Sequence, residues 1–144
     1  SLAYHIVFST KDREPWLVDS IRERLWPYLA GIARENDLVL LEAGGVSDHV
    51  HLLLSIPPSI AVAKAIQTIK GGATHWLKTN WANLHGFSWQ DGYGAFTVSE
   101  SQVEAVREYI RGQQEHHRIT TFAEEYRVFL KRHRIDFDER YLLG

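Results

Sequence analysis

The chain has 144 residues, of which 44% are hydrophobic and 24% are charged, a composition typical of a globular protein rather than a disordered one. Sixteen Lys and Arg oppose eighteen Asp and Glu, and the net charge of -2 excludes a polybasic coat for nucleic acid but not a local basic patch. The lack of cysteine excludes disulfide scaffolds, cysteine-ligated zinc and thiol catalysis. With no signal peptide and no apolar run of the roughly 18 residues that span a bilayer, we expect a cytoplasmic protein without a membrane partner.

The first part of the chain predicts one helix among three strands. Residues 4–10 are rich in β-branched and aromatic side chains and predict a strand. A helix is expected from Asp19 or Ser20 to about residue 35, on an apolar stripe with helical spacing. Strands are predicted over 38–43 and 49–56, the second ended by two prolines that cannot continue a ladder.

The second part predicts helices around one further strand. Ser59 is expected to cap a helix that carries Ile60, Ala63, Ile66 and Ile69 and is weakened at two consecutive glycines. A loop over 82–92 then leads into a strand over 92–99. A helix is expected from about residue 101, and a shorter one over 122–132.

The order β-α-β-β-α-β-α-α predicts an α+β protein. Its first six elements follow the split βαβ pattern of ferredoxin-like sandwiches, with an antiparallel sheet, helices on one face and the other face open. We expect one domain over 1–144, with a core over 1–100, an added helix at about 101–118 and a tail over 119–144.

Two histidines in the third predicted strand are candidate metal ligands. His49 and His51 are two residues apart, so both imidazoles project from one face of the strand. They could converge on one divalent metal, with Asp48 as an accessory group beside them. The alternative is a pair of half-buried strand histidines with ordinary partners.

The helix expected from residue 101 supplies a second candidate group. Tyr109 and Gln113 are four residues apart and therefore one helical turn apart on one face. Two imidazoles and a carboxamide suit Mg²⁺ or Mn²⁺ better than a closed zinc site. The alternative is a tyrosine at a helix–sheet boundary and a solvent-exposed glutamine.

His116 is an accessory candidate on the Tyr109 side, and the other histidines are expected to be structural or solvated, namely His5, His75, His85, His117 and His133.

Basic side chains provide candidate contacts to a phosphate backbone. The segment 57–90 has no carboxylate, and three lysines lie within it. The full set of candidates is Lys64, Lys70, Lys78, Arg107, Arg111 and Arg118, with Trp81, Trp89 or Tyr93 available to stack on an unpaired base. The alternative for 57–90 is a buried helix followed by a tryptophan-anchored loop.

Four segments in order along the chain resemble the single-domain IS200/IS605-type transposases, prokaryotic enzymes of the HUH tyrosine class. They are Val7-Phe8-Ser9-Thr10-Lys11, Gly45-Val46-Ser47-Asp48-His49-Val50-His51-Leu52-Leu53, Trp89-Gln90-Asp91-Gly92-Tyr93-Gly94-Ala95-Phe96, and Tyr109-Ile110-Arg111-Gly112-Gln113-Gln114-Glu115-His116-His117-Arg118. The histidine strand and the Tyr-x-x-x-Gln segment are far more specific together than either is alone. Gly112 departs from the larger residue that relatives often carry there.

The resemblance implies a role for each matching residue. His49 and His51 would bind the metal with Gln113 as third ligand, and Tyr109 would be the nucleophile on the added helix. The protein would be a homodimer that cuts and rejoins single-stranded DNA at ends marked by imperfect hairpins, through a 5′-phosphotyrosine. It would act on DNA in the nucleoid as part of a mobile element.

Other functions remain open at this level. The same histidines could serve a metal-dependent single-strand nuclease that activates water. The fold could also belong to a host-adapted protein that binds hairpin DNA without transposition, or to a plain interaction module.

Overall fold

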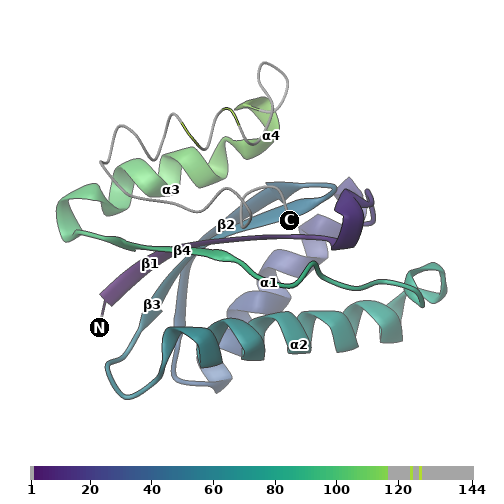
Figure 1. Ribbon diagram of the computed structural model, residues 1–144, viewed down its shortest axis with the longest axis horizontal. Coiled ribbons are helices and arrows are strands. Elements are labelled where there is room, and N and C mark those ends of the chain that lie inside the picture. The colour runs from purple at the N-terminus through teal and green to yellow at the C-terminus, as the bar shows by residue number, and fades with distance from the viewer. Residues whose placement is uncertain (1, 117–123, 125–126, 128–144) are drawn as a thin grey trace.

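One four-stranded antiparallel sheet forms the middle layer of the computed structural model, which describes residues 2–116, 124 and 127 (Figure 1). Its strands are β1 (Leu2–Ser9), β2 (Val39–Val46), β3 (His49–Ile56) and β4 (Gly94–Val98), in the order β2-β3-β1-β4. All three neighbouring pairs are antiparallel. This is the predicted α+β architecture, and the ferredoxin-like expectation is confirmed.

Alternation along the two central strands divides the sheet into an apolar face and a histidine face. Even-numbered side chains of β1 and β3, such as Ile6, Phe8, Val50 and Leu52, join the main core. That core is covered by α1 (Asp19–Glu35) and α2 (Val62–Asn80), which lie together on one side of the sheet (Figure 1). Burial of this surface fixes the strand register, because a slip by one residue would move the apolar side chains to the other face.

The other face is covered by α3 (Val103–Arg111), so the expectation of an open face is wrong for this part of the sheet (Figure 1). Val106 and Ile110 of α3 pack on Leu53 of β3 in a second, smaller core. This contact holds α3 over β2 and β3.

The helix α2 differs from its prediction at its first residue and at its two consecutive glycines. It begins at Val62 after an extended Ala61, so Ser59 is not its cap. It also runs through Gly71 and Gly72 without interruption. A methyl group at Gly72 would lie 2.7 Å from the Ile32 side chain, so the missing side chain there permits close packing of α2 on α1.

Two strands and the tyrosine helix also have different bounds. β2 extends beyond the predicted residue 43 to Val46 and is irregular between Leu40 and Glu42, whereas β4 is shorter than the predicted 92–99. α3 ends at Arg111, Gly112 takes a non-helical conformation, and α4 (Gln113–His116) follows. Tyr109 and Gln113 therefore lie on two short helices and not on one continuous helix.

Short 3-10 turns cover Lys11–Arg13, Ala82–Leu84 and Glu100–Gln102. The helix expected over 122–132 and the tail over 119–144 lie outside the described residues, apart from positions 124 and 127. None of the helices described is long and apolar enough to cross a membrane.

Candidate active site

The two strand histidines lie where the sequence predicts, on the face of β3 that α3 covers. The rings of His49 and His51 are 5.3 Å apart between centroids, and both side chains are fully buried. Both come at the start of β3, directly after the tight connection from β2. The hairpin and the strand alternation thus place two imidazoles side by side in a dry environment.

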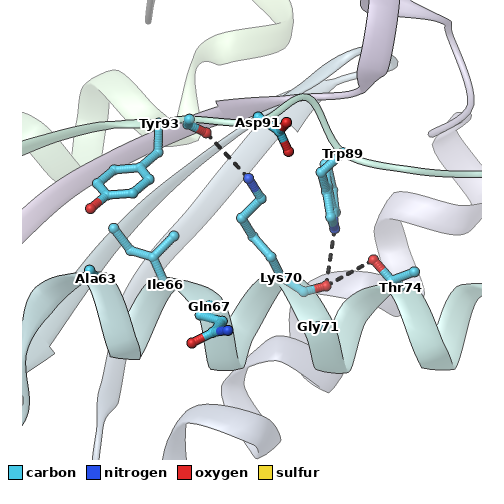
Figure 2. Close-up of a pocket in the computed structure, with 10 residues that line it drawn as sticks. Ala63, Ile66, Gln67, Lys70, Gly71, Thr74, Trp89, Asp91 and Tyr93 are labelled. Carbon is cyan, nitrogen blue, oxygen red and sulfur yellow. Dashed lines mark hydrogen bonds between the residues drawn. The ribbon is translucent and has the colours of Figure 1, made fainter.

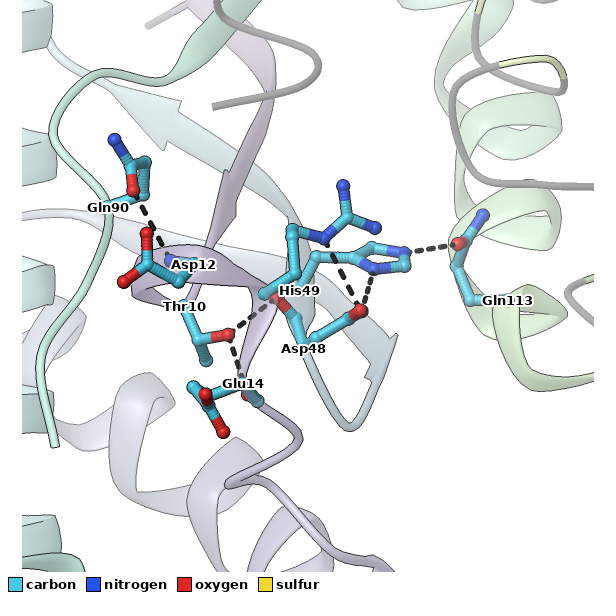
Figure 3. A network of polar contacts seen from close by, with 8 residues as sticks. Thr10, Asp12, Glu14, Asp48, His49, Gln90 and Gln113 are labelled. Atoms are coloured by element: carbon cyan, nitrogen blue, oxygen red, sulfur yellow. Dashed lines mark hydrogen bonds and ion pairs between the residues drawn. The ribbon is translucent and has the colours of Figure 1, made fainter.

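Asp48 fixes the orientation of His49. Its Oδ1 lies 2.7 Å from His49 Nδ1, and its Oδ2 accepts a hydrogen bond from Arg13 Nε at 3.3 Å (Figure 3). Burial raises the pKa of Asp48, but the hydrogen bond with His49 and the charge of Arg13 outweigh burial and hold the pKa below its usual range. The ionised carboxylate therefore accepts the Nδ1 hydrogen of His49, and the lone pair of that ring lies on Nε2.

The Nε2 atom of His49 points at the amide of Gln113. Nε2 and Oε1 are 3.4 Å apart, and Gln113 is buried at the start of α4 (Figure 3). Burial is the largest influence on His49 and lowers its pKa, although Asp48 opposes it, so the imidazole is neutral near neutral pH. A neutral imidazole is the form that ligates a metal.

These contacts fit a divalent cation. The amide oxygen and Nε2 are both acceptors, so two lone pairs face each other over 3.4 Å. Ligand atoms about 2.1 Å from one ion lie roughly 3.0–3.4 Å from each other, so a cation between the two would replace a repulsion with two bonds. If the amide rotates by 180°, its nitrogen donates to Nε2 instead, which suits the metal-free protein equally.

A metal site here would need the side-chain amide of Gln113 as a ligand. Within residues 2–116, 124 and 127, no three His, Asp or Glu side chains are arranged to hold a metal ion. The predicted set of His49, His51 and Gln113 would therefore combine two imidazoles with one carboxamide, and the structure brings His49 Nε2 to 3.4 Å from the Gln113 amide.

A third histidine belongs to this cluster, and sequence reasoning missed it. His5 of β1 is fully buried, with its Nε2 3.0 Å from His51 Nδ1, so of the two expected alternatives it is structural and not solvated. Alternation places His5 on the same face as Val7 and Ser9, but the pairing of β1 with β3 brings it to His51. That long-range pairing is not visible in the local sequence.

The ring of Tyr109 packs against the rings of His5 and His51. Its ring centroid is 5.8 Å from that of His51 and 5.9 Å from that of His5, in edge-on contacts, and its hydroxyl oxygen is buried. The strand histidines, Tyr109 and Gln113 thus meet within a single chain.

Two features of β2 hold the tyrosine helix against the sheet. Glu42 pairs with Arg111 at 2.9 Å and with Arg107 at 3.5 Å. A methyl group at Gly44 would lie 2.2 Å from the backbone oxygen of Ile110, so the helix backbone comes so close that only glycine fits there. Two of the predicted DNA-contacting arginines are therefore paired with a carboxylate in this structure.

The predicted lysines lie on α2, in the helix layer on the far side of the sheet. Lys64 and Lys78 are exposed. Lys70 instead donates to the backbone oxygens of Gln90 and Gly92, at 3.0 and 3.2 Å, and burial lowers its pKa. These two bonds tie α2 to the segment 89–93, and the Lys70 side chain is partly buried.

A cavity of about 400 Å³ opens beside Lys70 (Figure 2). Tyr93 and Trp89 line it, but Trp89 is held by a hydrogen bond from its Nε1 to the Lys70 backbone oxygen and by edge contacts with Phe8 and Phe87. Trp81 packs edge-on against Trp76. Both tryptophans thus have structural contacts, and Tyr93 is the remaining stacking candidate beside the cavity.

The remaining histidine and arginine candidates fall in two groups. His75 and His85 are exposed, as expected for solvated side chains. Arg118, His117, His133 and the side chain of His116 lie outside the described part of the chain.

Sequence comparison places this arrangement in a known family. Residues 1–113 match the family described as "Transposase IS200 like". The chain is 31% identical over 117 residues to the ISDra2 transposase TnpA of Deinococcus radiodurans, covering 78% of this chain and 84% of that relative. It is 29% identical over 117 residues to the transposase for insertion sequence element IS200 of Salmonella typhimurium, covering 78% of this chain and 76% of the relative.

Solved structures agree with this assignment. A crystal structure of a Deinococcus radiodurans R1 protein described as a transposase superposes with a TM-score of 0.65 at 31% identity, over 78% of this chain and 90% of that one. A REP-associated tyrosine transposase bound to a REP hairpin superposes with a TM-score of 0.59 at 14% identity, over 77% of this chain and 65% of that one, a likeness of fold. From the family match and the relatives, the chain belongs to the IS200-like transposase family.

Proposed function

We propose that this chain cuts and rejoins single-stranded DNA through a covalent bond between Tyr109 and a 5′-phosphate. The observation that carries the proposal is the position of Tyr109, whose ring lies 5.8 Å from that of His51 beside the His49–Gln113 pair. A tyrosine packed against candidate metal ligands suits nucleophilic attack on a phosphodiester, and this chain belongs to a transposase family.

The reaction conserves the phosphodiester energy. The phenolic oxygen of Tyr109 attacks phosphorus, the P–O3′ bond breaks, and the phenolic hydrogen is lost as the leaving oxygen takes one up to become a 3′-hydroxyl. A second 3′-hydroxyl can attack the phosphotyrosine by the reverse route, which joins new ends without an external energy source. Attack by water would release the end instead and would only degrade DNA.

His49, His51 and Gln113 would hold a Mg²⁺ or Mn²⁺ ion at this site. When bound, a divalent cation neutralises charge on the scissile phosphate and polarises its bonds. Asp48 orients His49 with its lone pair on Nε2, and the packing of α3 on the sheet buries the hydroxyl oxygen of Tyr109. The protein's own contribution is therefore to orient three ligands and one nucleophile in advance of binding.

The proposed DNA partner is single-stranded DNA with imperfect hairpins at the element ends, bound by a homodimer. Family membership supports DNA as the substrate, and one protein of this fold is described as bound to a REP hairpin. Stacking on Tyr93 and phosphate contacts from Lys64 and Lys78 would supply binding outside the site.

A denaturing gel tests the proposal. The protein is incubated with labelled single-stranded DNA carrying the ends of its element, with Mn²⁺ or Mg²⁺, beside a Tyr109→Phe variant. The matched control is Tyr28→Phe, since Tyr28 lies on α1 stacked against Trp76 on the far side of the sheet. We expect a shifted protein–DNA band with the wild type and the control, and none with Tyr109→Phe or with EDTA.

Other outcomes identify the alternatives. Cleavage without a covalent band, retained by Tyr109→Phe, would indicate a nuclease that activates water. Hairpin binding without cleavage would indicate a DNA-binding derivative of the family.

A further inference from the structure

His5 is fully buried beside the candidate metal ligands, and the function proposed above gives it no task. It lies on β1 opposite Leu53, and His51 lies on β3 opposite Val7, so the two histidines are diagonal neighbours on one face of the sheet. His5 Nε2 is 3.0 Å from His51 Nδ1. We propose that His5 is a positioning residue that accepts the Nδ1 hydrogen of His51 and so keeps the lone pair of His51 on Nε2.

Only one direction of this hydrogen bond leaves His51 able to ligate. If His5 donated to His51 Nδ1, the neutral His51 ring would carry its hydrogen on Nε2 and would have no lone pair for a metal there. If His51 donates, its Nε2 carries the lone pair. The assignment of His51 as a ligand through Nε2 therefore requires His5 to be the acceptor.

The other ligand is held in the same way. His49 has its Nδ1 2.7 Å from a carboxylate oxygen of Asp48, which leaves Nε2 toward Gln113. Both strand histidines thus use Nδ1 for a protein partner, one a carboxylate and the other an imidazole. Partners of this kind fix the tautomer and ring orientation of metal-ligating histidines.

His5 also touches the nucleophile, which decides the choice of variants. Its ring packs edge-on against Tyr109, with 5.9 Å between centroids. His5→Phe keeps a ring in that place and removes the acceptor. His5→Gln restores an oxygen at the reach of the imidazole Nε2. A role in packing alone would be served by Phe and not by Gln.

This inference rests on the proposed metal site, and Mn²⁺ binding separates the two. Titration of the metal-free protein with Mn²⁺, followed by electron paramagnetic resonance, gives a dissociation constant for each variant. We expect His5→Phe to weaken Mn²⁺ binding by about 10–100-fold and His5→Gln to recover most of the loss. No Mn²⁺ binding by the wild type would overturn the metal site itself. Equal binding by the wild type and His5→Phe, or failure of His5→Gln to recover the loss, would overturn only the role of His5.

A second measurement needs no variant and no metal. Long-range ¹H–¹⁵N spectra of the wild-type imidazoles report which ring nitrogen carries the hydrogen. We expect the hydrogen of His51 on Nδ1 in the metal-free protein, bonded to an unprotonated Nε2 of His5. A hydrogen on Nε2 of His51 would contradict the proposal whether or not the protein binds Mn²⁺.

Discussion

Asp48 is the side chain that contacts Nδ1 of His49 and so orients its ring. Its carboxylate is 2.7 Å from His49 Nδ1 and also pairs with Arg13 at 3.3 Å. We expect Asp48→Asn to weaken Mn²⁺ binding by about 10–100-fold, because the amide can present its nitrogen to Nδ1 and turn the ring to the wrong tautomer. Calorimetric titration of the metal-free protein measures this loss.

The control for this variant is Asp37→Asn, which changes an exposed carboxylate in the turn before β2. It should bind Mn²⁺ as the wild type does. If Asp48→Asn did the same, Asp48 would not be needed to orient His49 for the ion.

At the level of single residues, the sequence predicts neighbours on one strand but not partners across strands. Alternation alone places His49 and His51 on one face, and the structure confirms that placement. The contact between His5 and His51 depends on the register between β1 and β3. It joins two residues that are 46 positions apart in the chain. The ion pair of Asp48 with Arg13 likewise joins residues far apart in the chain, which the fold and not the local sequence brings together.

Among the elements, α3 carries Tyr109, the proposed nucleophile, and the close approach of α3 to β2 positions this tyrosine. A methyl group at Gly44 would meet the Ile110 backbone oxygen at 2.2 Å, and a helix backbone cannot move aside as a flexible side chain can. We expect Gly44→Ala to destabilise the fold by about 1–3 kcal/mol, as overpacking does, and to displace Tyr109 and Gln113 from the histidines. Urea unfolding measures the first effect and Mn²⁺ affinity the second.

Gly71 provides the matched control for Gly44. It lies in α2 with no atom within 4 Å of the methyl group that alanine would add. Gly71→Ala should leave Mn²⁺ binding unchanged and stabilise the protein by up to about 1 kcal/mol, the difference in helix propensity. Equal stability of the two variants would show that α3 does not depend on the close approach at Gly44.

The ion pairs of Glu42 are expected to contribute less than the contact at Gly44. Both arginine partners are partly exposed, with 37% and 55% of their side-chain surface accessible for Arg107 and Arg111. Exposed pairs are weak and screened by salt. Glu42→Gln should therefore lower the melting temperature less than Gly44→Ala does, with a difference from wild type that shrinks in high salt. A loss that is larger than that of Gly44→Ala and independent of salt would contradict this ranking.

The elements themselves were largely predictable, and their ends were not. The apolar stripes of α1, α2 and α3 follow directly from helical spacing. Gly71 and Gly72 read as a helix break because the packing of α2 on α1, which keeps the helix intact, is a tertiary contact. Conversely, Gly112 does end α3, as its weak helix propensity predicts.

In the molecule as a whole, the predicted DNA-contacting side chains that are described lie on opposite sides of the sheet. Exposed Lys64 and Lys78 lie on α2, whereas Arg107 and Arg111 lie with the tyrosine helix on the other side of the sheet. If DNA contacts α2, the double variant Lys64→Ala/Lys78→Ala should weaken hairpin binding and lower the salt slope of binding by about 1–2. Filter binding over a series of salt concentrations measures both quantities.

Arg34→Ala is the control for the lysine pair, since Arg34 is an exposed cation near the end of α1. It should leave the salt slope unchanged. An unchanged slope for the lysine double variant would instead place the DNA away from α2. The homodimer that the family resemblance implies stays a prediction, and sedimentation of the free protein would test it.

The fold class could be predicted from the order of elements, because a split βαβ pattern has few compatible arrangements. The site could be predicted only in part. Its strand half follows from alternation, while its helix half depends on how α3 docks across β2, through Gly44 and Glu42. No local pattern in the sequence encodes that docking.

Detection of a covalent bond between Tyr109 and DNA would test the proposed reaction directly. After reaction with single-stranded DNA carrying the element ends, the complex is digested with nuclease and trypsin and analysed by mass spectrometry. Trypsin cuts after Arg107 and Arg111, so Tyr109 lies in the four-residue peptide 108–111. We predict a nucleotide remnant on Tyr109 of this peptide. A remnant on another residue, or cleaved DNA with the peptide unmodified, would contradict the assignment of Tyr109 as the nucleophile.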